Sequence, residues 1–110
     1  MRRIQQAVAS KWADYLIFAA RYDAAESRIS RVRVHADHGD SLGPGMELLR
    51  HQVISLLASG TTFATMLRGH GEQGWKRGAF VTPVVLDGVT YLRTDQDDAA
   101  GDDLDGLPTF

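Results

Sequence analysis

An Asp-Gly pair set between two short runs of β-branched and aromatic residues constrains the fold of this chain more than any other feature. Asp87 and Gly88 are typical of a two-residue hairpin turn, because that turn needs positive φ angles, which these residue types tolerate. The flanking runs, Ala79 to Leu86 and Val89 to Thr94, are therefore predicted to be paired antiparallel strands.

Three more strands are expected upstream of this hairpin. Tyr15 to Tyr22 and Ile29 to Ala36 are rich in β-branched and aromatic residues, and the polar stretch between them favours a second hairpin. Thr61 to Arg68 has the same character. The five strands predict a small antiparallel sheet, which makes this an α+β domain once the helix described next is added.

One central helix is predicted over about residues 44–58. Pro44 suits the first helical position, and Gly60 stands where a helix should stop. Apolar residues recur at helical spacing between these two signals: Met46, Leu49, Val53, Leu56 and Leu57. The expected order of elements is β-β-α-β-β-β.

The two ends of the chain are expected to differ from its centre. Ile4, Val8 and Trp12 recur at helical spacing, which predicts a short amphipathic helix within residues 1–13. Residues 14–94 form the predicted single domain, and residues 95–110 an acidic, partly ordered tail.

Composition narrows the class of protein. A chain of 110 residues with 44% hydrophobic residues is long enough for one domain with its own core. It contains no Cys, which excludes disulfides and thiolate chemistry, and no apolar run of membrane-spanning length. With no signal-peptide pattern at its start, the expected location is cytoplasmic.

Charge is distributed unevenly along the chain. Six of the 14 acidic residues lie from Asp95 onward, where there is no Lys or Arg, so eight acidic residues face 12 basic ones in residues 1–94. The body of the protein is basic and its tail is acidic, and the tail could fold back onto a basic surface.

The alternation of side chains along the first hairpin predicts which of its residues face the core. One face is apolar and contains Leu16, Phe18, Ala20, Val32 and Val34. The opposite face gathers guanidinium, imidazole and aromatic groups: Tyr15, Ile17, Arg21, Arg31, Arg33 and His35. Because strands need no clustering of Arg in order to form, this face is a candidate binding site for carboxylate or phosphate.

Patterns that resemble cofactor or metal motifs have simpler explanations. Residues 69–74 match GxGxxG, but a strand is predicted after them, where a dinucleotide site needs a helix N-terminus. Two imidazoles and two carboxylates in one short segment are acceptable metal ligands: His35, Asp37, His38 and Asp40. Turn formation explains the same residues, so we expect no catalytic residue, no cofactor and no bound metal.

Motifs spread over most of the chain from Asp14 onward resemble a known family. They are Tyr15-Leu16-Ile17, Arg21-Tyr22-Asp23, Gly39-Asp40-Ser41-Leu42-Gly43, Thr62-Phe63, Trp75-Lys76-Arg77-Gly78, the stretch from Asp87 to Asp95, and Asp103-Leu104-Asp105-Gly106-Leu107-Pro108. The chain is similar in these motifs to the bacterial domain-of-unknown-function family 3892. That family has no established activity, so the resemblance implies none, and the N-terminal helix lies outside it.

The sequence favours a non-enzymatic binding module that uses its basic hairpin face for an anionic partner, which could be nucleic acid, a nucleotide or an acidic protein segment. Further candidate binding residues are Lys76, Arg77 and Arg93. The modest charge of the body and the acidic tail argue against nucleic acid.

Two alternatives stay open. The first is a self-assembling structural or regulatory component, because both faces of the last hairpin are apolar and the N-terminal helix needs a docking surface. The expected homo-oligomer interface contains Ile4, Val8, Trp12, Val84, Leu86 and Tyr91. The second alternative is a small enzyme with its site near His35, Asp37 and His38.

Overall fold

The computed structural model describes residues 11–23, 28–39, 41–68, 75–94, 102, 104 and 107–110. It contains seven strands and one helix in that part of the chain: β1 (Tyr15–Asp23), β2 (Arg28–Ala36), β3 (Met46–Leu49), α1 (Arg50–Ala58), β4 (Phe63–Arg68), β5 (Trp75–Phe80), β6 (Thr82–Leu86) and β7 (Val89–Arg93). The α+β class is therefore confirmed. The predicted N-terminal helix falls largely on residues 1–10, outside the described residues.

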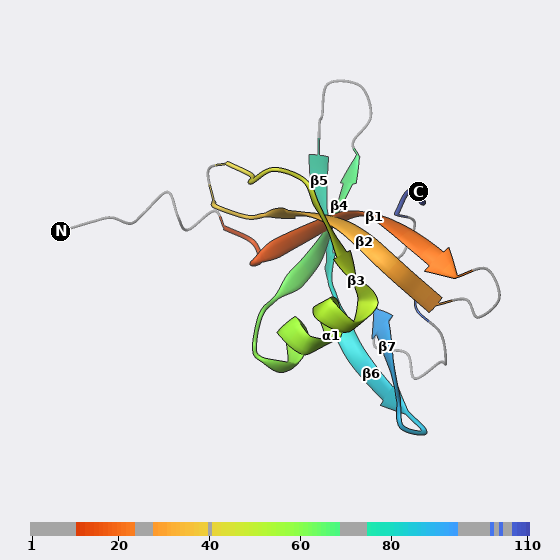
Figure 1. Ribbon diagram of the computed structural model, residues 1–110. Helices are drawn as coiled ribbons and strands as arrows, with labels where there is room; N and C mark the ends of the chain where they lie inside the picture. Colours follow the sequence, from red (N-terminus) through yellow and green to blue (C-terminus); the bar gives the residue numbers. More distant parts are fainter. Residues whose placement is uncertain are drawn as a thin grey trace.

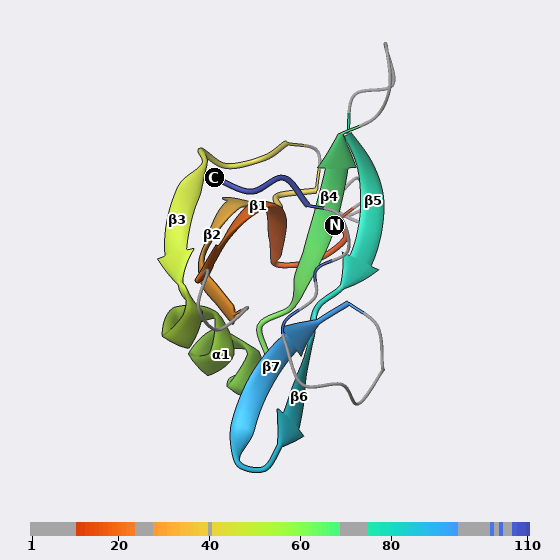
Figure 2. The ribbon, with the colours of Figure 1, turned by 90° about the vertical axis from the view of Figure 1, so that its right-hand side faces the viewer.

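The main sheet has five strands in the order β3-β2-β1-β4-β5, and β6 and β7 form a separate hairpin. The prediction of one antiparallel sheet is wrong, because β1 and β4 pair in parallel, with Tyr15 opposite Phe63. A parallel pair needs a crossover connection, which β2, β3 and α1 supply here. Figures 1 and 2 show the main sheet curling, with α1 and the β6–β7 hairpin together at one end.

A β-bulge in β1 overturns part of the predicted facing of the first hairpin. The pairing of β1 with β2 is shifted between Ile17 and Ala19, which leaves Phe18 as the extra residue. Because a bulge exchanges the two faces of a strand, Tyr15 and Ile17 pack into the core and do not share the face of Arg21. Phe18 was predicted to share the core face of Val32 and Val34. It packs instead against a second, smaller cluster that contains Leu16, and it stacks on the ring of His35, with ring centroids 4.5 Å apart.

The predicted helix over residues 44–58 begins six residues late. Met46–Leu49 form the edge strand β3, which pairs antiparallel with β2 and places Glu47 opposite Arg33. The hydrophobic periodicity of one segment carries no information about an unpaired strand edge elsewhere in the fold. Here, pairing with the edge of β2 overrides helix propensity. The end of the helix is as expected, since α1 stops at Ala58 and Gly60 follows with φ of 98°.

The last hairpin forms in the predicted register. Asp87 and Gly88 have φ angles of 51° and 79°, as a type I′ turn requires, and Val84 lies opposite Tyr91. The strand predicted to run from Ala79 to Leu86 is divided, because β5 ends at Phe80 and β6 begins at Thr82.

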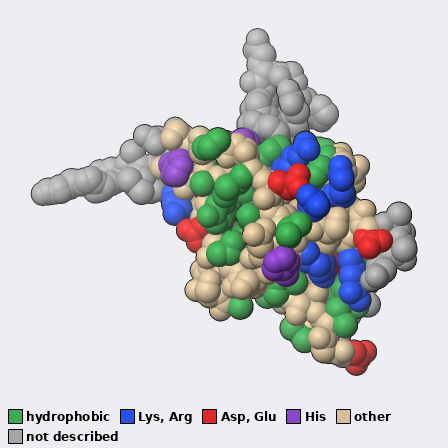
Figure 3. Space-filling model, viewed as in Figure 1, with side chains coloured by type: hydrophobic (Ala, Val, Ile, Leu, Met, Phe, Trp, Pro, Cys, Tyr) green, Lys and Arg blue, Asp and Glu red, His purple; other side chains and the backbone are tan. Residues whose placement is uncertain are grey.

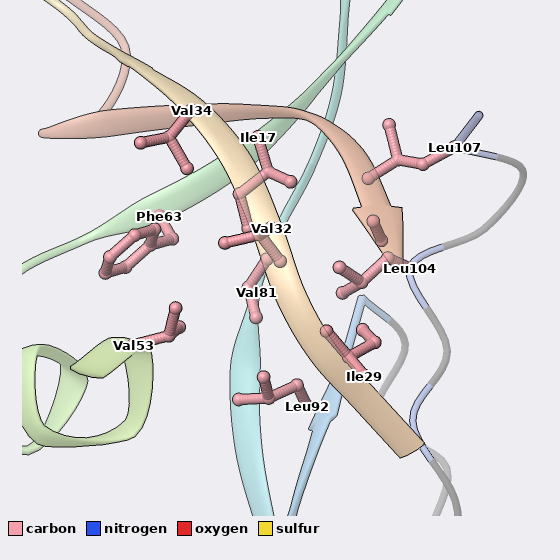
Figure 4. Packing of buried hydrophobic residues seen from close by; sticks show 11 residues of the cluster. Ile17, Ile29, Val32, Val34, Val53, Phe63, Val81, Leu92, Leu104 and Leu107 are labelled. Atoms are coloured by element: carbon pink, nitrogen blue, oxygen red, sulfur yellow. The ribbon is translucent and has the colours of Figure 1, made fainter. Parts of the chain in front are cut away.

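One large core joins the main sheet, α1, the last hairpin and the tail. Figure 4 shows its side chains meeting from all these elements. Its fully buried members include Ile17, Val32, Val53, Phe63, Leu92 and Leu104. Leu104 and Leu107 are both buried, so these two apolar residues of the acidic tail are part of the core.

Candidate functional site

Three arginines gather on the outer surface of β1 and β2, on the side of the sheet away from the large core. Arg21 and Arg31 are direct cross-strand partners, and Arg33 follows two residues later on β2. We call this surface, with Glu47 of β3, the basic face: Arg21, Arg31, Arg33 and Glu47. Figure 3 shows Lys and Arg side chains grouped around an acidic one over β1, β2 and β3.

Glu47 partly neutralises the basic face. Its Oε2 lies 2.6 Å from Nη1 of Arg31, and its Oε1 lies 4.0 Å from Nε of Arg33. The hydrogen bond from Arg31 lowers the pKa of Glu47, as do the nearby charges of Arg31, Arg33 and Arg21. One carboxylate among three guanidinium groups leaves an excess of two positive charges among the side chains Arg21, Arg31, Arg33 and Glu47.

The end of the described chain lies on the same face. Nε of Arg21 donates a hydrogen bond of 2.8 Å to the carbonyl oxygen of Phe110. The guanidinium carbons of Arg21 and Arg33 lie 5.0 Å and 4.1 Å from the centroid of the Phe110 ring. Both distances are within the range of cation–π contacts. The tail does fold back onto the basic face, and the described residue that reaches it is aromatic.

A shallow pocket of about 290 Å³ opens beside the arginines. It is lined by Phe18, Arg33, Gly45, Met46 and Glu47. Its wall is fixed by His35, which stacks on Phe18 and whose Nδ1 lies 2.8 Å from the carbonyl oxygen of Gly43. Because a carbonyl oxygen only accepts, Nδ1 carries the proton. The basic face therefore has an apolar surface next to its charges.

In the loop after β2, the residues whose types could ligate a metal have other roles where the structure describes them. The carboxylate of Asp37 accepts hydrogen bonds from the backbone N–H groups of Trp12, Ala13 and Gly39 at 2.7, 3.2 and 2.9 Å. Burial raises the pKa of Asp37, but these backbone donors outweigh burial and lower it. Asp37 therefore anchors the segment before β1.

The other candidate residues of this loop differ in their surroundings. His35 is engaged with Gly43, His38 is exposed, and Asp40 lies outside the described residues. No group of three or more ligand side chains that could hold a metal ion occurs in the described part of the chain. A pocket of about 400 Å³ lies nearby, lined by Lys11, Asp14, Tyr15, Ala36, Asp37, His38 and Thr61.

Several predicted binding residues lie away from the basic face. Tyr15 stacks on Phe63 next to the core, with ring centroids 5.3 Å apart, and Arg93 is buried. The backbones of Lys76 and Arg77 lie in β5, on the far side of β4 from β1, and their side chains are not described. Of the predicted set, Arg21, Arg31 and Arg33 meet, with His35 joined to them through Phe18 and the pocket.

The described structure covers only part of the predicted oligomer interface, in which Val84 and Tyr91 are direct cross-strand partners. Ile4 and Val8 lie outside the described residues. Trp12 packs edge-on against Phe80, with ring centroids 6.3 Å apart. The remaining three members of the predicted interface are partly buried within the chain itself: Val84, Leu86 and Tyr91.

Glu47 of the basic face, and Phe110 that packs on it, were not among the predicted binding residues. Glu47 was placed on the predicted helix, where its position relative to Arg31 and Arg33 could not be read. Phe110 lies in the tail, for which only an acidic, partly ordered segment was predicted. A carboxylate opposite an Arg-rich strand is a signal that becomes readable only when β3 is identified as a strand.

The fold and the site define a small α+β domain with a curled mixed sheet, an Arg-rich outer face and a tail folded onto that face. The chain belongs to the family described as "Protein of unknown function (DUF3892)", whose pattern matches residues 17–108. No curated protein and no solved structure matches the chain. Among the described residues, no helix is long and apolar enough to cross a membrane.

Proposed function

We propose that this protein is a non-catalytic binding module whose basic face recognises an anionic partner. The observation that carries the proposal is the meeting of Arg21, Arg31 and Arg33 on adjacent strands with one carboxylate between them. Guanidinium groups match the planar geometry of carboxylate and phosphate groups, and each offers several donors.

The arrangement is unfavourable for the isolated domain, which supports a role in binding. Arg21 and Arg31 are directly opposite across β1 and β2, and like charges in that position destabilise a sheet. Glu47 offsets only part of this repulsion. The side chains of Arg31 and Arg33 remain 47% and 48% exposed, so both can reach a partner.

Replacing Arg31 and Arg33 together with Ala tests the proposal. Binding of polyglutamate and of a single-stranded oligonucleotide is measured at two ionic strengths by fluorescence anisotropy. The double variant should bind the preferred anion about a hundredfold or more weakly, because each of two lost charge-assisted hydrogen bonds contributes roughly 1.5–3 kcal/mol. Its binding should also depend less steeply on salt.

Lys11 supplies a control for charge alone, because its side chain is 41% exposed and it pairs with Asp14 away from the basic face. Arg31→Ala and Arg33→Ala should each weaken binding more than Lys11→Ala does. Equal effects from all three single variants, or unchanged affinity in the double variant, would remove the basic face as the binding surface.

Self-association is a second candidate function. Two large apolar side chains on consecutive strands of different sheets, β5 and β6, are prominently exposed, Phe80 at 48% and Val85 at 64%. A second copy of the chain would cover both side chains by symmetry.

A further inference from the structure

Two segments share the edge of β1 that faces away from β2. β4 pairs in parallel with the first three residues of β1. Beyond the bulge, residues 108–110 run parallel to β1 beside Ala20. The N–H of Ala20 donates to the carbonyl oxygen of Pro108 at 3.0 Å, and the N–H of Phe110 donates to the carbonyl oxygen of Ala20 at 3.3 Å. Figure 2 shows this C-terminal segment passing close to β1.

The last residues are held differently from the tail residues before them. Leu104 and Leu107 are buried in the core, whereas Pro108 and Thr109 are exposed. Residues 108–110 are attached by two backbone hydrogen bonds to Ala20 and by the contacts of Phe110 with Arg21 and Arg33. Separation of residues 108–110 from β1 would therefore leave Leu104 and Leu107 buried in the core.

We propose that this part of the β1 edge, with Arg21 and Arg33, is a strand-addition site for an extended acidic peptide that carries an aromatic side chain. Residues 108–110 of the chain occupy the site in cis, and a partner segment displaces them. The inference rests on the proposed function and narrows it, because it selects one class of anionic partner.

The chemistry of the site favours a peptide over a nucleic acid. The edge of β1 offers an N–H and a C=O of the same residue, Ala20, which is the pairing that another extended chain completes. The two guanidinium groups already hold an aromatic ring, as they would hold Phe, Tyr or Trp of a partner. Glu47 lies among the arginines and would repel a long run of phosphates or carboxylates, whereas a peptide with one or two carboxylates can bind beside it.

Occupation in cis makes a quantitative prediction. A tethered segment competes at a high effective concentration, and a site that is open only part of the time binds its partner more weakly by that fraction. Weakening the attachment of residues 108–110 should therefore increase the affinity for a peptide added in trans.

The experiment uses the full chain and an acetylated, amidated peptide, Leu-Pro-Thr-Phe-Glu-Glu, which copies residues 107–110 and adds two carboxylates. Affinity is measured by calorimetry for the native chain, Phe110→Ala and Phe110→Pro. The proline variant also removes the N–H that donates to Ala20. We expect affinity to rise in that order, with a total gain on the order of tenfold.

Two control peptides separate the parts of the inference. Replacing Phe of the peptide with Ala should abolish binding, and replacing both Glu with Gln should weaken it and remove its salt dependence. Equal affinity for all three proteins, or undiminished binding of the Ala peptide, overturns the strand-addition site.

Failure of this inference is distinguishable from failure of the proposed function. Binding of polyglutamate or of the oligonucleotide without binding of the aromatic peptide rejects the strand-addition site alone. Equal binding of the Glu and Gln peptides, with no binding of polyglutamate, rejects the anion-binding function.

A titration of the native chain needs no variant and keeps the test decisive if substitution at Phe110 impairs folding. In proton–nitrogen correlation spectra, added peptide should shift the amide signals of Ala20 and Phe110 together, because one gains a new partner as the other loses its own. A Phe110 signal that stays in place while the peptide binds elsewhere overturns the proposal.

Discussion

At the scale of single residues, one carboxylate joins parts of the chain that are far apart in sequence. The side chain of Asp102 is fully buried and pairs with the guanidinium of Arg50 at the start of α1. Its oxygens also accept hydrogen bonds from the N–H groups of Ile29 and Leu92 at 2.6 and 2.8 Å. Arg50 in turn donates to the carbonyl oxygens of Ile29 and Thr90. Asp102 thus links the tail to β2, α1 and β7.

Replacing Asp102 with Asn should strongly destabilise the fold. The amide keeps the size of the side chain but removes the charge that compensates Arg50. Breaking a buried ion pair on one side costs about 3–5 kcal/mol, a large part of the roughly 5–15 kcal/mol by which domains are stable. Urea unfolding followed by circular dichroism measures the change.

Glu47→Gln is the matched control, because it removes the same charge from an exposed ion pair. Exposed pairs contribute little to stability. If Asp102→Asn unfolds at the same urea concentration as Glu47→Gln, the ion pair between Asp102 and Arg50 does not stabilise the fold as proposed.

At the scale of elements, the segment before β1 is attached to the end of β2 and to the start of β4. Asp37 binds the backbone of Trp12 and Ala13, and Asp14 accepts hydrogen bonds from the N–H and hydroxyl of Thr62. The backbone bond from Thr62 and the bond from Lys11 lower the pKa of Asp14. Both carboxylates therefore favour the folded state when they are ionised.

Stability should fall when the protein is acidified. A carboxyl whose pKa is lower in the folded than in the unfolded state stabilises the fold above its unfolded pKa. That stabilisation is lost as the pH falls through the folded pKa. For Asp14 and Asp37 the loss should begin below about pH 4. Urea midpoints at a series of pH values measure it.

Asp37→Asn should lower stability at neutral pH and flatten the decline in acid. Asp87→Asn removes the same charge at an exposed turn, where Asn also tolerates the φ of 51°. A pH profile that is as steep in Asp37→Asn as in the parent protein would contradict the role given to Asp37.

At the scale of the whole molecule, the exposed side chains of Phe80 and Val85 argue for self-association. We expect size-exclusion chromatography with light scattering to show a dimer at high micromolar concentration, which Val85→Lys dissociates. Leu42→Lys is the control, since Leu42 is 41% exposed in the loop after β2. A native chain that stays monomeric at that concentration would exclude self-association.

The sequence by itself determined the features that depend on neighbouring residues. The Asp87-Gly88 turn formed as predicted because its two positive φ angles are a local requirement. The alternation of Arg31 and Arg33 on β2 follows from the period of a strand, so two arginines of the basic face could be found in advance.

Only the tertiary structure decided the rest. The bulge at Phe18 changed the faces of β1, and pairing with the edge of β2 made a strand of Met46–Leu49. The same long-range packing brought Glu47 and Phe110 to the arginines and buried Asp102 against Arg50. These contacts join residues that are distant along the chain. A local sequence pattern cannot predict them, because it does not show which distant residues will become neighbours in the fold.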